Sequence, residues 1–251
     1  MTTPTPSYKE LLDAGVHFGH LKRKWNPKMT PYIFMERKGI HVIDINRTIE
    51  CMEKAGAALK SIARSGKKIM FVATKKQAKK LVIESAMSVG MPYVTERWLG
   101  GMMTNFSTIR KSIKKMQGIE RMLGDSNVSL TKKERLTMTR EKDKMNKVLG
   151  GIANLNRLPS AIFIVDIHHE HIAVSESQKL GLRTFGIVDT NSDPNLIDFP
   201  IPANDDASKS VKIITDYIVE CIKEGLAERN SKGNEKAAAG AKAAAATKAK
   251  A

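Results

Sequence analysis

The sequence predicts an α/β protein: a doubly wound, five-stranded parallel sheet with one inserted helical hairpin. Short apolar runs such as 69–73 and 161–165 lack alternating polar residues, which is typical of strands buried on both faces. Segments with helical periodicity separate these runs, as expected for β-α-β crossovers. A long basic segment, residues 106–149, interrupts this alternation once.

Residues 1–39 are predicted to hold a short helix followed by a basic arm. Residues 8–14 favour a helix that Ser7 caps and Gly15 ends. The arm is irregular, and its cations surround a tryptophan: Lys22, Arg23, Lys24, Trp25 and Lys28. So many cations are not expected in the core of a globular protein. We therefore expect an extended arm that lies on a negatively charged partner.

The sheet domain is predicted to span residues 40–105 and 150–228. Its strands are expected at 40–44, 68–73, 93–95, 161–166 and 184–189. Helices are expected where apolar residues recur with helical spacing, at 47–65, 74–89, 170–180 and 205–226. Thr74 directly follows a strand and is expected to cap the second of these helices.

Residues 106–149 are predicted to form a projecting coiled-coil hairpin. Two apolar stripes have helical spacing: Ile109, Ile113, Met116 and Leu123, then Met138, Met145, Leu149 and Ile152. Residues 124–127 predict the turn, and Thr131 with Glu134 predicts a capping box that restarts the helix. Residues 107–147 hold 12 basic and 5 acidic residues. Such an excess of one sign on a protrusion favours a polyanionic partner over a merely solvated face.

The overall composition narrows the class of partner. The formal net charge is +16, which favours nucleic acid. No membrane association is expected, because long apolar runs, a signal peptide and lipidation motifs are lacking. Cys51 and Cys221 lie far apart and are expected to be reduced, as in a cytoplasmic protein. Residues 229–251 are almost all Ala and Lys beyond Lys232, so we expect a disordered tail. We expect no homo-oligomer.

The loops after the predicted strands argue against an enzyme. The sequence contains neither G-x-G-x-x-G nor G-x-x-x-x-G-K-[ST], so a free nucleotide site is not expected. Lys75 and Lys76 follow a predicted strand, where a helix N-terminus binds an RNA phosphate as well as a nucleotide phosphate. No nucleophile stands in an activating context, so neither a catalytic residue nor a catalytic cofactor is expected.

Residues 97–105 combine a cation, an aromatic ring and a Gly-Gly pair in the sequence RWLGGMMTN. The guanidinium of Arg97 can donate two hydrogen bonds to a phosphate, and the neighbouring indole ring of Trp98 can stack on a base. The alternative is a turn from strand to helix with a buried tryptophan. Asn105 lies where this segment meets the basic hairpin.

A dispersed set of residues is a candidate metal site. Asp189 ends a predicted strand, while Asp205 and Asp206 open the last helix. With His20 of the arm they provide one imidazole and three carboxylates, a donor set that suits a tetrahedral ion if the arm folds over the sheet edge. The alternative is that Asp205 caps the helix and Asp189 forms a turn.

Five collinear motifs resemble the bacterial small-subunit ribosomal protein "S two" family: GVHFGH at 15–20, WNPKM at 25–29, RWLGGM at 97–102, DTNSDP at 189–194 and IPANDDA at 201–207. The resemblance implies a flavodoxin-like sheet with a coiled-coil hairpin, seated on ribosomal RNA of the small subunit in the cytoplasm. It also implies contacts with neighbouring small-subunit proteins, including the messenger-binding protein "S one" that the family helps to dock. It further implies a structural zinc ion, whose matching positions here are His20, Asp189, Asp205 and Asp206.

We therefore predict a non-enzymatic rRNA-binding protein that reads backbone and shape rather than sequence. The predicted rRNA-binding residues are Lys22, Arg23, Lys24, Trp25, Lys28, Lys75, Lys76, Arg97, Trp98, Asn105, Arg110, Lys111, Lys114 and Lys115. The cations would neutralise phosphates, and the tryptophans would stack on bases or brace the arm if buried. Two rival classes are a flavodoxin-like enzyme and a general nucleic-acid chaperone.

Overall fold

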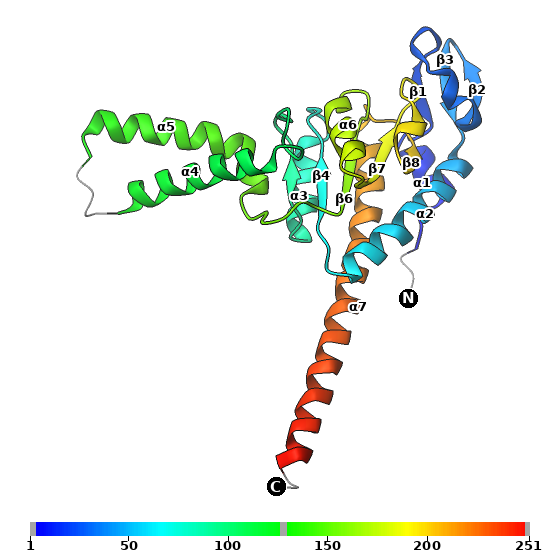
Figure 1. Cartoon of the computed structure of the whole chain (residues 1–251). Helices are drawn as coiled ribbons and strands as arrows, with labels where there is room; N and C mark the ends of the chain where they lie inside the picture. Colours follow the sequence, from blue (N-terminus) through cyan, green and yellow to red (C-terminus); the bar gives the residue numbers. More distant parts are fainter. Residues whose placement is uncertain (1–3, 126–129, 249–251) are drawn as a thin grey trace.

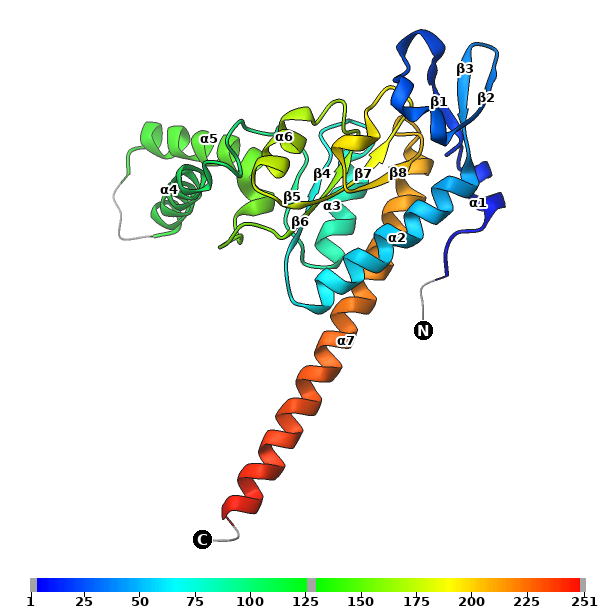
Figure 2. The ribbon, with the colours of Figure 1, turned by 45° about the vertical axis from the view of Figure 1, so that its right-hand side comes forward.

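The computed structural model describes residues 4–125 and 130–248, and for residues 232–248 it describes the backbone alone. A parallel sheet lies at the centre with helices on both faces, and two projections leave it at opposite ends: a small β-sheet and a helical hairpin (Figure 1). Helix α7 (Ser208–Lys248) continues well past the sheet (Figure 2). No helix in the described part of the chain has both the length and the apolar character needed to cross a membrane.

The central sheet has five parallel strands in the order β5-β4-β6-β7-β8. They are β4 (Ile69–Val72), β5 (Tyr93–Val94), β6 (Ala161–Val165), β7 (Arg183–Val188) and β8 (Phe199–Pro202). One row of aligned aromatic residues crosses all five strands: Tyr93, Phe71, Phe163, Phe185 and Phe199. The predicted number and parallel direction of the strands are therefore confirmed.

The membership of the sheet differs from the prediction in one strand. The predicted strand at 40–44 is β3 (Ile40–Ile43), which lies in a separate antiparallel sheet between β1 (Phe18–Leu21) and β2 (Ile33–Arg37). The fifth strand of the main sheet is β8, which the sequence analysis missed. Its prolines, Pro200 and Pro202, argue against a strand, but β8 is an edge strand, where proline is tolerated.

The arm is more regular than the extended segment that we predicted. Residues 18–21 are strand β1, and the basic stretch that follows forms two 3₁₀ helices, η1 (Lys22–Lys24) and η2 (Pro27–Tyr32). Backbone hydrogen bonds tie the arm to the rest of the chain, including one from Asn26 N–H to the Thr190 carbonyl at 2.8 Å. The cations are therefore displayed from an ordered platform.

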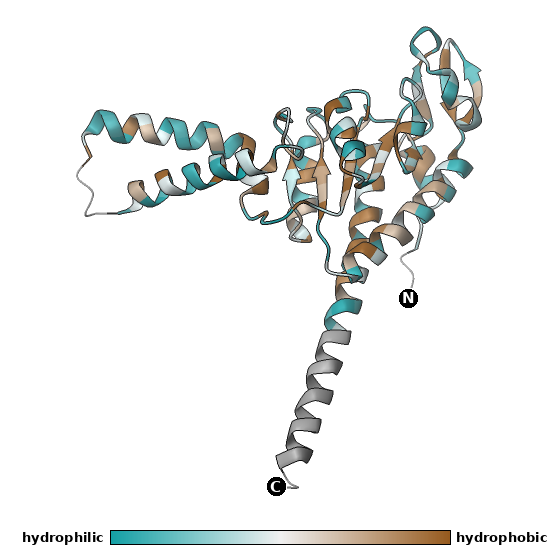
Figure 3. Cartoon of the chain, viewed as in Figure 1, coloured by the Kyte–Doolittle hydropathy of each residue, from teal (hydrophilic) through white to brown (hydrophobic). Residues whose placement is uncertain are grey.

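A hydrophobic core lies on each face of the central sheet. Helices α2 (Ile45–Arg64), α3 (Lys79–Ser88) and α7 pack on the face that carries the aromatic row. Helix α6 (His171–Lys179) and the base of the hairpin pack on the other face, together with Trp98 and Met102. Apolar residues concentrate in the sheet and its covering helices, while the hairpin is mainly hydrophilic (Figure 3). Cys51 and Cys221 are both free cysteines in the structure.

The helix ends test the predicted caps. Ser7 caps α1 (Tyr8–Asp13) and forms a capping box with Glu10, which confirms the prediction. Helix α3 begins at Lys79 rather than beside Thr74, so the predicted role of Thr74 as its cap was wrong. The Thr74 N–H instead donates to Glu170 Oε1 at 3.0 Å, because this buried carboxylate needs donors that water cannot supply.

Helices α4 (Phe106–Gly124) and α5 (Lys132–Leu149) form the predicted hairpin. The Thr131 capping box at the start of α5 is confirmed. The α4 stripe is buried through Ile119, whereas Met138 and Met145 of α5 are half-buried. Pairing of the helices is thus established for the described residues, while coiled-coil packing stays a prediction. Residues 126 and 127 of the predicted turn lie outside the described residues.

The C-terminal segment differs from the disordered tail that we expected. Helix α7 continues through residue 229 to Lys248, and only residues 249–251 of the predicted tail lie outside the described part. Alanine has the highest helix propensity of any residue, and the segment contains no proline to end the helix. A composition that cannot build a core is therefore still compatible with a helix.

The close packing of α2 on α7 gives the first testable prediction. A Cβ at Gly225 would lie 2.4 Å from the Lys60 carbonyl oxygen of α2, whereas a Cβ at Gly118 of α4 would meet nothing within 4 Å. Gly225→Ala should lower the free energy of unfolding by about 1–3 kcal/mol, despite the better helix propensity of alanine. Gly118→Ala, the matched control, should raise it by up to about 1 kcal/mol. Urea unfolding measures both, and equal stabilities would contradict the described packing.

Candidate functional site

Several ionisable residues meet at the carboxyl-terminal edge of the central sheet. Asp166 follows β6, Asp189 follows β7, and Asp205 and Asp206 come shortly after β8. Parallel strands end at the same edge, which is where sites gather in doubly wound folds. Asp166 has a φ of 65°, in the left-handed region, and its carboxylate accepts a hydrogen bond from the His169 N–H at 3.0 Å.

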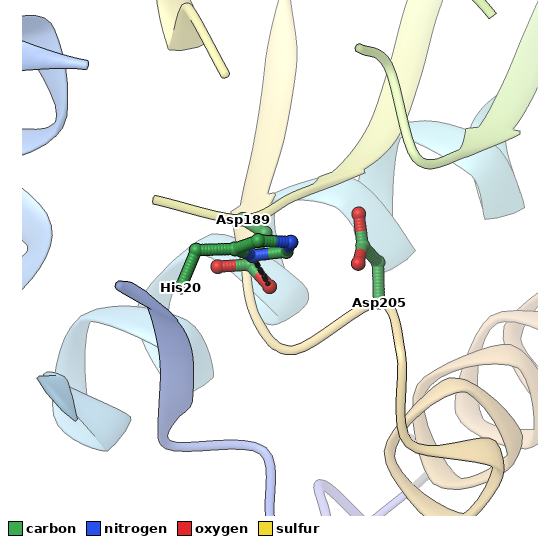
Figure 4. Close-up of side chains that lie close together, drawn as sticks. All are labelled: His20, Asp189 and Asp205. Carbon is green, nitrogen blue, oxygen red and sulfur yellow. Dashed lines mark ion pairs between the residues drawn. The ribbon is translucent and has the colours of Figure 1, made fainter. Parts of the chain in front are cut away.

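The arm folds over this edge and brings His20 to the carboxylates (Figure 4). His20 Nδ1 lies 2.9 Å from Asp189 Oδ2, and Nε2 lies 3.6 Å from Asp206 Oδ2. The His20 N–H also donates to the Thr190 hydroxyl at 2.8 Å. A Cβ at Gly19 would lie 2.6 Å from the Thr190 side chain, so glycine at this position allows the arm to approach closely.

Lys75 occupies the middle of the cluster. Its Nζ lies 3.3 Å from Asp166 Oδ2, 2.7 Å from Asp205 Oδ1 and 2.6 Å from Asp206 Oδ1. Burial alone lowers the pKa of this lysine, but the hydrogen bonds to Asp205 and Asp206 outweigh burial, so its pKa is raised. Lys75 was predicted to bind an RNA phosphate, and in the structure three carboxylates contact its ammonium group.

Asp205 is the most deeply buried member of the cluster. Its side chain is fully buried, and its Oδ2 has no hydrogen-bond partner among the described residues. Burial, together with the nearby Asp166 and Asp189, raises the pKa of Asp205 to about 7. The hydrogen bond to Asp189 raises the pKa of His20. The interior of the cluster therefore has an unused oxygen beside an imidazole.

The predicted metal ligands are brought together in part. Ligand atoms of His20, Asp189 and Asp205 all lie within 4.8 Å of one another. Asp206 borders this group, but its Oδ1 is paired with Lys75 and the side chain is largely exposed. The arm thus places the His20 imidazole at the sheet edge. The buried free oxygen of Asp205 fits a cation better than it fits a helix cap.

The Arg97–Asn105 loop closes around a buried carboxylate, that of Glu176 in α6. The Trp98 Nε1–H donates to Glu176 Oε1 at 3.0 Å, and the Gly101 N–H donates to the same oxygen at 2.8 Å. The N–H groups of Met103 and Thr104 donate to Oε2, each at 3.0 Å. Gly101 adopts a φ of 83° in this turn, which glycine allows at little cost.

Trp98 therefore braces the fold and cannot stack on RNA in this arrangement, since it is only 6% exposed. The structure corrects that part of the prediction and favours the alternative of a turn with a buried tryptophan. Sequence reasoning missed Glu176 altogether, because a glutamate in a helix is usually solvated. Burial raises the pKa of this carboxyl, but the hydrogen bonds from Thr104, Trp98, Met103 and Gly101 outweigh it, and the pKa is lowered.

The remaining predicted rRNA-binding residues divide by what they contact. Lys22 pairs with Glu36 at 2.6 Å, Lys28 with Asp193 and Lys115 with Glu141. Arg110 donates to the Asn156 backbone carbonyl at 2.8 Å, and the side-chain Oδ1 of Asn105 accepts from the Thr108 hydroxyl at 2.9 Å. Exposed cations with no ion pair in the described part of the chain are Arg23, Lys24, Lys76, Arg97, Lys111 and Lys114.

Trp25 has a different environment from Trp98. It is half-buried, and its ring lies 5.1 Å from that of His41, centroid to centroid, at an angle of 41°. His41 is itself buried, so the histidine braces one side of the indole. Trp25 therefore packs on His41 among the arm cations and keeps part of its surface in contact with solvent.

These features are typical of a protein that binds a polyanion. An α/β core displays unpaired cations on an arm and a hairpin, and its sheet edge is occupied by compensated charges rather than by a catalytic pocket. Comparison with known proteins agrees: residues 11–225 match the family described as Ribosomal protein S2. The chain belongs to this family, whose members are structural proteins of the small ribosomal subunit rather than enzymes.

Several relatives are similar over most of their length. The protein named small ribosomal subunit protein uS2 of Cytophaga hutchinsonii is 63% identical over 223 residues, covering 88% of each chain. The protein of the same name from Parabacteroides distasonis is 58% identical over 226 residues, covering 90% of this chain and 81% of the relative. That of Bacteroides fragilis is 57% identical over 235 residues, covering 93% and 84%.

The buried Glu176 gives a pH-dependent prediction. Glu176→Gln should lower the free energy of unfolding by about 1–3 kcal/mol at neutral pH, as expected for hydrogen bonds to a charged acceptor. The folded-state pKa lies below the ordinary value of 4.5, so the stabilisation is complete above that value and is lost as the pH falls through the folded pKa. The difference between wild type and variant, measured by urea unfolding, should therefore shrink in acid.

The control for this prediction is Glu220→Gln, which removes an exposed glutamate whose only ion pair within the described residues is with Lys223, three residues along the helix. It should change stability by less than about 0.5 kcal/mol at any pH. A Glu176→Gln difference that persisted undiminished in strong acid would show that the charge of Glu176 is not what holds the loop.

Proposed function

We propose that the chain is a structural constituent of the small ribosomal subunit in the cytoplasm and binds its rRNA with the arm and the hairpin. The observation that supports this most directly is the set of exposed, unpaired cations on these two projections. Arg23 and Lys24 lie on the arm, while Lys111 and Lys114 lie on α4. Neutralising RNA phosphates offsets the repulsion that these cations feel in the free protein.

The proposed contacts are to the RNA backbone and to shape. Arg23, Lys24, Arg97 and the cations of α4 would engage phosphates, because A-form helices hide base edges from side chains. Trp25 would add a stacking surface held in place by His41. Lys22, Lys28 and Lys115 would position neighbouring acidic residues or exchange their ion pairs for phosphates on binding.

A second surface is suited to a protein neighbour. Exposed apolar side chains gather around a cavity of 390 Å³ that α1, β1 and β2 line with β3. Phe34 is 69% exposed, and Tyr8, Phe18, Met35 and Leu12 are each more than 40% exposed. An apolar patch of this kind marks a protein interface rather than an RNA interface. We propose that a neighbouring small-subunit protein docks here, and the messenger-binding protein "S one" is the candidate that the family suggests.

The acidic cluster would hold one structural zinc ion. His20, Asp189 and Asp205 would be its ligands, with Asp206 beside them, and the ion would tie the arm to the sheet edge. Imidazole nitrogen and carboxylate oxygen are both accepted zinc ligands. Because Lys75 already compensates part of the negative charge, the ion would compete with an internal ammonium group for Asp205.

The zinc proposal is tested by metal analysis. The purified protein should contain about one zinc per chain, and Asp205→Asn should lower that content severalfold because the buried ligand loses its charge. Asp198→Asn is the control, since Asp198 accepts hydrogen bonds from Thr184 away from the cluster. Zinc-free protein whose thermal stability is unaffected by added zinc would contradict the proposal.

The RNA proposal is tested on the arm. Arg23→Ala with Lys24→Ala should weaken binding to small subunits that lack this protein. If each residue contacts one phosphate, the slope of log affinity against log salt should fall in magnitude by roughly 1–2. Co-sedimentation at rising salt measures both. Lys209→Ala with Lys212→Ala removes two exposed cations from α7 and should change neither.

The same assay separates the rival of a general nucleic-acid chaperone. If the chain binds a specific site on the small subunit, it should bind the subunit far more tightly than it binds random RNA duplexes. Equal affinities would favour the chaperone. An unchanged salt slope in the arm variant would remove the arm from the RNA footprint.

A further inference from the structure

A cavity at the amino-terminal edge of the sheet has no part in the function proposed above. Its volume is 770 Å³, which lies within the usual range of ligand pockets, about 300–1,000 Å³. One wall comes from the residues where β4, β5 and β6 begin: Lys68, Pro92, Tyr93 and Ser160. The other wall is formed by Gly150 and Gly151, which follow α5, and by residues 154–158.

The charged side chains that line this cavity are all positive. Lys67, Lys68 and Arg157 line it, and no aspartate or glutamate is among its lining residues, all of which lie in the described part of the chain. Lys68 Nζ donates to the Gly90 carbonyl at 2.8 Å. Lys67 and Arg157 are exposed and have no carboxylate partner among the described residues. The cavity is therefore complementary to an anion.

The interior offers surfaces that suit a nucleobase. Tyr93, Pro92 and Leu155 supply apolar area, and the amides of Asn154 and Asn156 supply hydrogen-bond donors and acceptors. Gly151 packs closely on Tyr93, because a Cβ there would lie 2.1 Å from the Tyr93 carbonyl oxygen and 2.7 Å from its ring. Stacking on an aromatic ring and edge contacts with amides are how proteins hold an unstacked base.

The position of the cavity connects it to the hairpin. Gly150 directly follows α5, and Arg110 of α4 donates to the carbonyl oxygen of Asn156 in the cavity wall at 2.8 Å. RNA that follows the cations of the hairpin toward the sheet would thus arrive at this cavity.

We propose that the cavity receives an unpaired nucleotide of a single-stranded rRNA segment. The base would lie against Tyr93 and the amides, while Lys67 and Arg157 would contact the adjacent phosphates. This inference rests on the proposed rRNA binding and extends it from duplex backbone to a single-stranded feature. A base that is paired within a helix cannot enter the cavity.

The test places a photo-crosslinking residue at the rim. Leu158, which is 39% exposed and lines the cavity, is replaced by p-benzoylphenylalanine in the full chain. The chain is assembled into small subunits and irradiated, and crosslinks to rRNA are mapped by primer extension. We expect crosslinks at one or a few unpaired nucleotides.

Charge-reversal variants supply the matched control. Lys67→Glu with Arg157→Glu should lower the crosslink yield at least about tenfold, because two phosphate contacts are lost. Lys209→Glu with Lys212→Glu makes the same change of charge near the opposite edge of the sheet and should leave the yield unchanged.

The outcomes separate this inference from the function on which it rests. Crosslinks to paired nucleotides only, crosslinks to a protein neighbour, or none at all, in a chain that still co-sediments with subunits, would overturn the cavity assignment alone. A crosslink to a protein would show that a protein segment, and not RNA, lies at the rim. Failure of the otherwise unmodified chain to enter subunits would overturn the proposed function and this inference with it.

Discussion

Charge compensation at the carboxyl-terminal edge of the sheet is the constraint on which the structure depends. Parallel strands end together, so the aspartates that follow β6, β7 and β8 are forced into one place. Lys75, from the loop after β4, puts its ammonium group within 3.3 Å of Asp166 and 2.7 Å of Asp205. Buried carboxylates without such a partner repel one another and lose hydration. Lys75 thus links the ends of separate strands. The arm packs on the sheet edge that Lys75 stabilises.

A second buried charge fixes the other projection. Glu176 gathers the backbone N–H groups of Gly101, Met103 and Thr104 immediately before α4 begins. The direction in which the hairpin leaves the core is set by this turn, since Trp98 and Met102 pack into the core on the same side. Buried carboxylates therefore fix the orientation of both basic projections, the arm and the hairpin, relative to the core. Recognition of RNA by shape needs such fixed spacing between cations, because flexible cations would lose entropy on binding.

The parts of the fold that local signals determine could be predicted from the sequence. The buried strands have continuous apolar runs, and Ser7 has a glutamate three residues later, so both were found. Strand β8 was missed because Pro200 and Pro202 break the strand pattern, and only its edge position makes them acceptable. The sheet to which β3 belongs depends on long-range pairing that periodicity does not encode. A lysine in a loop and a glutamate in a helix are usually solvated, and only the tertiary structure shows that three carboxylates hold Lys75 and that Glu176 is buried.

Charge is distributed differently between the interior and the surface of the protein. Most carboxylates at the sheet edge, and Glu176, are buried and contacted by internal donors, whereas many cations of the arm and hairpin face solvent without an ion pair in the described part of the chain. The outer surface is therefore still more positive than the net charge of +16 suggests. A hairpin with excess positive charge and few buried residues in α5 gains little from folding alone. Binding a polyanion along both projections would remove this self-repulsion.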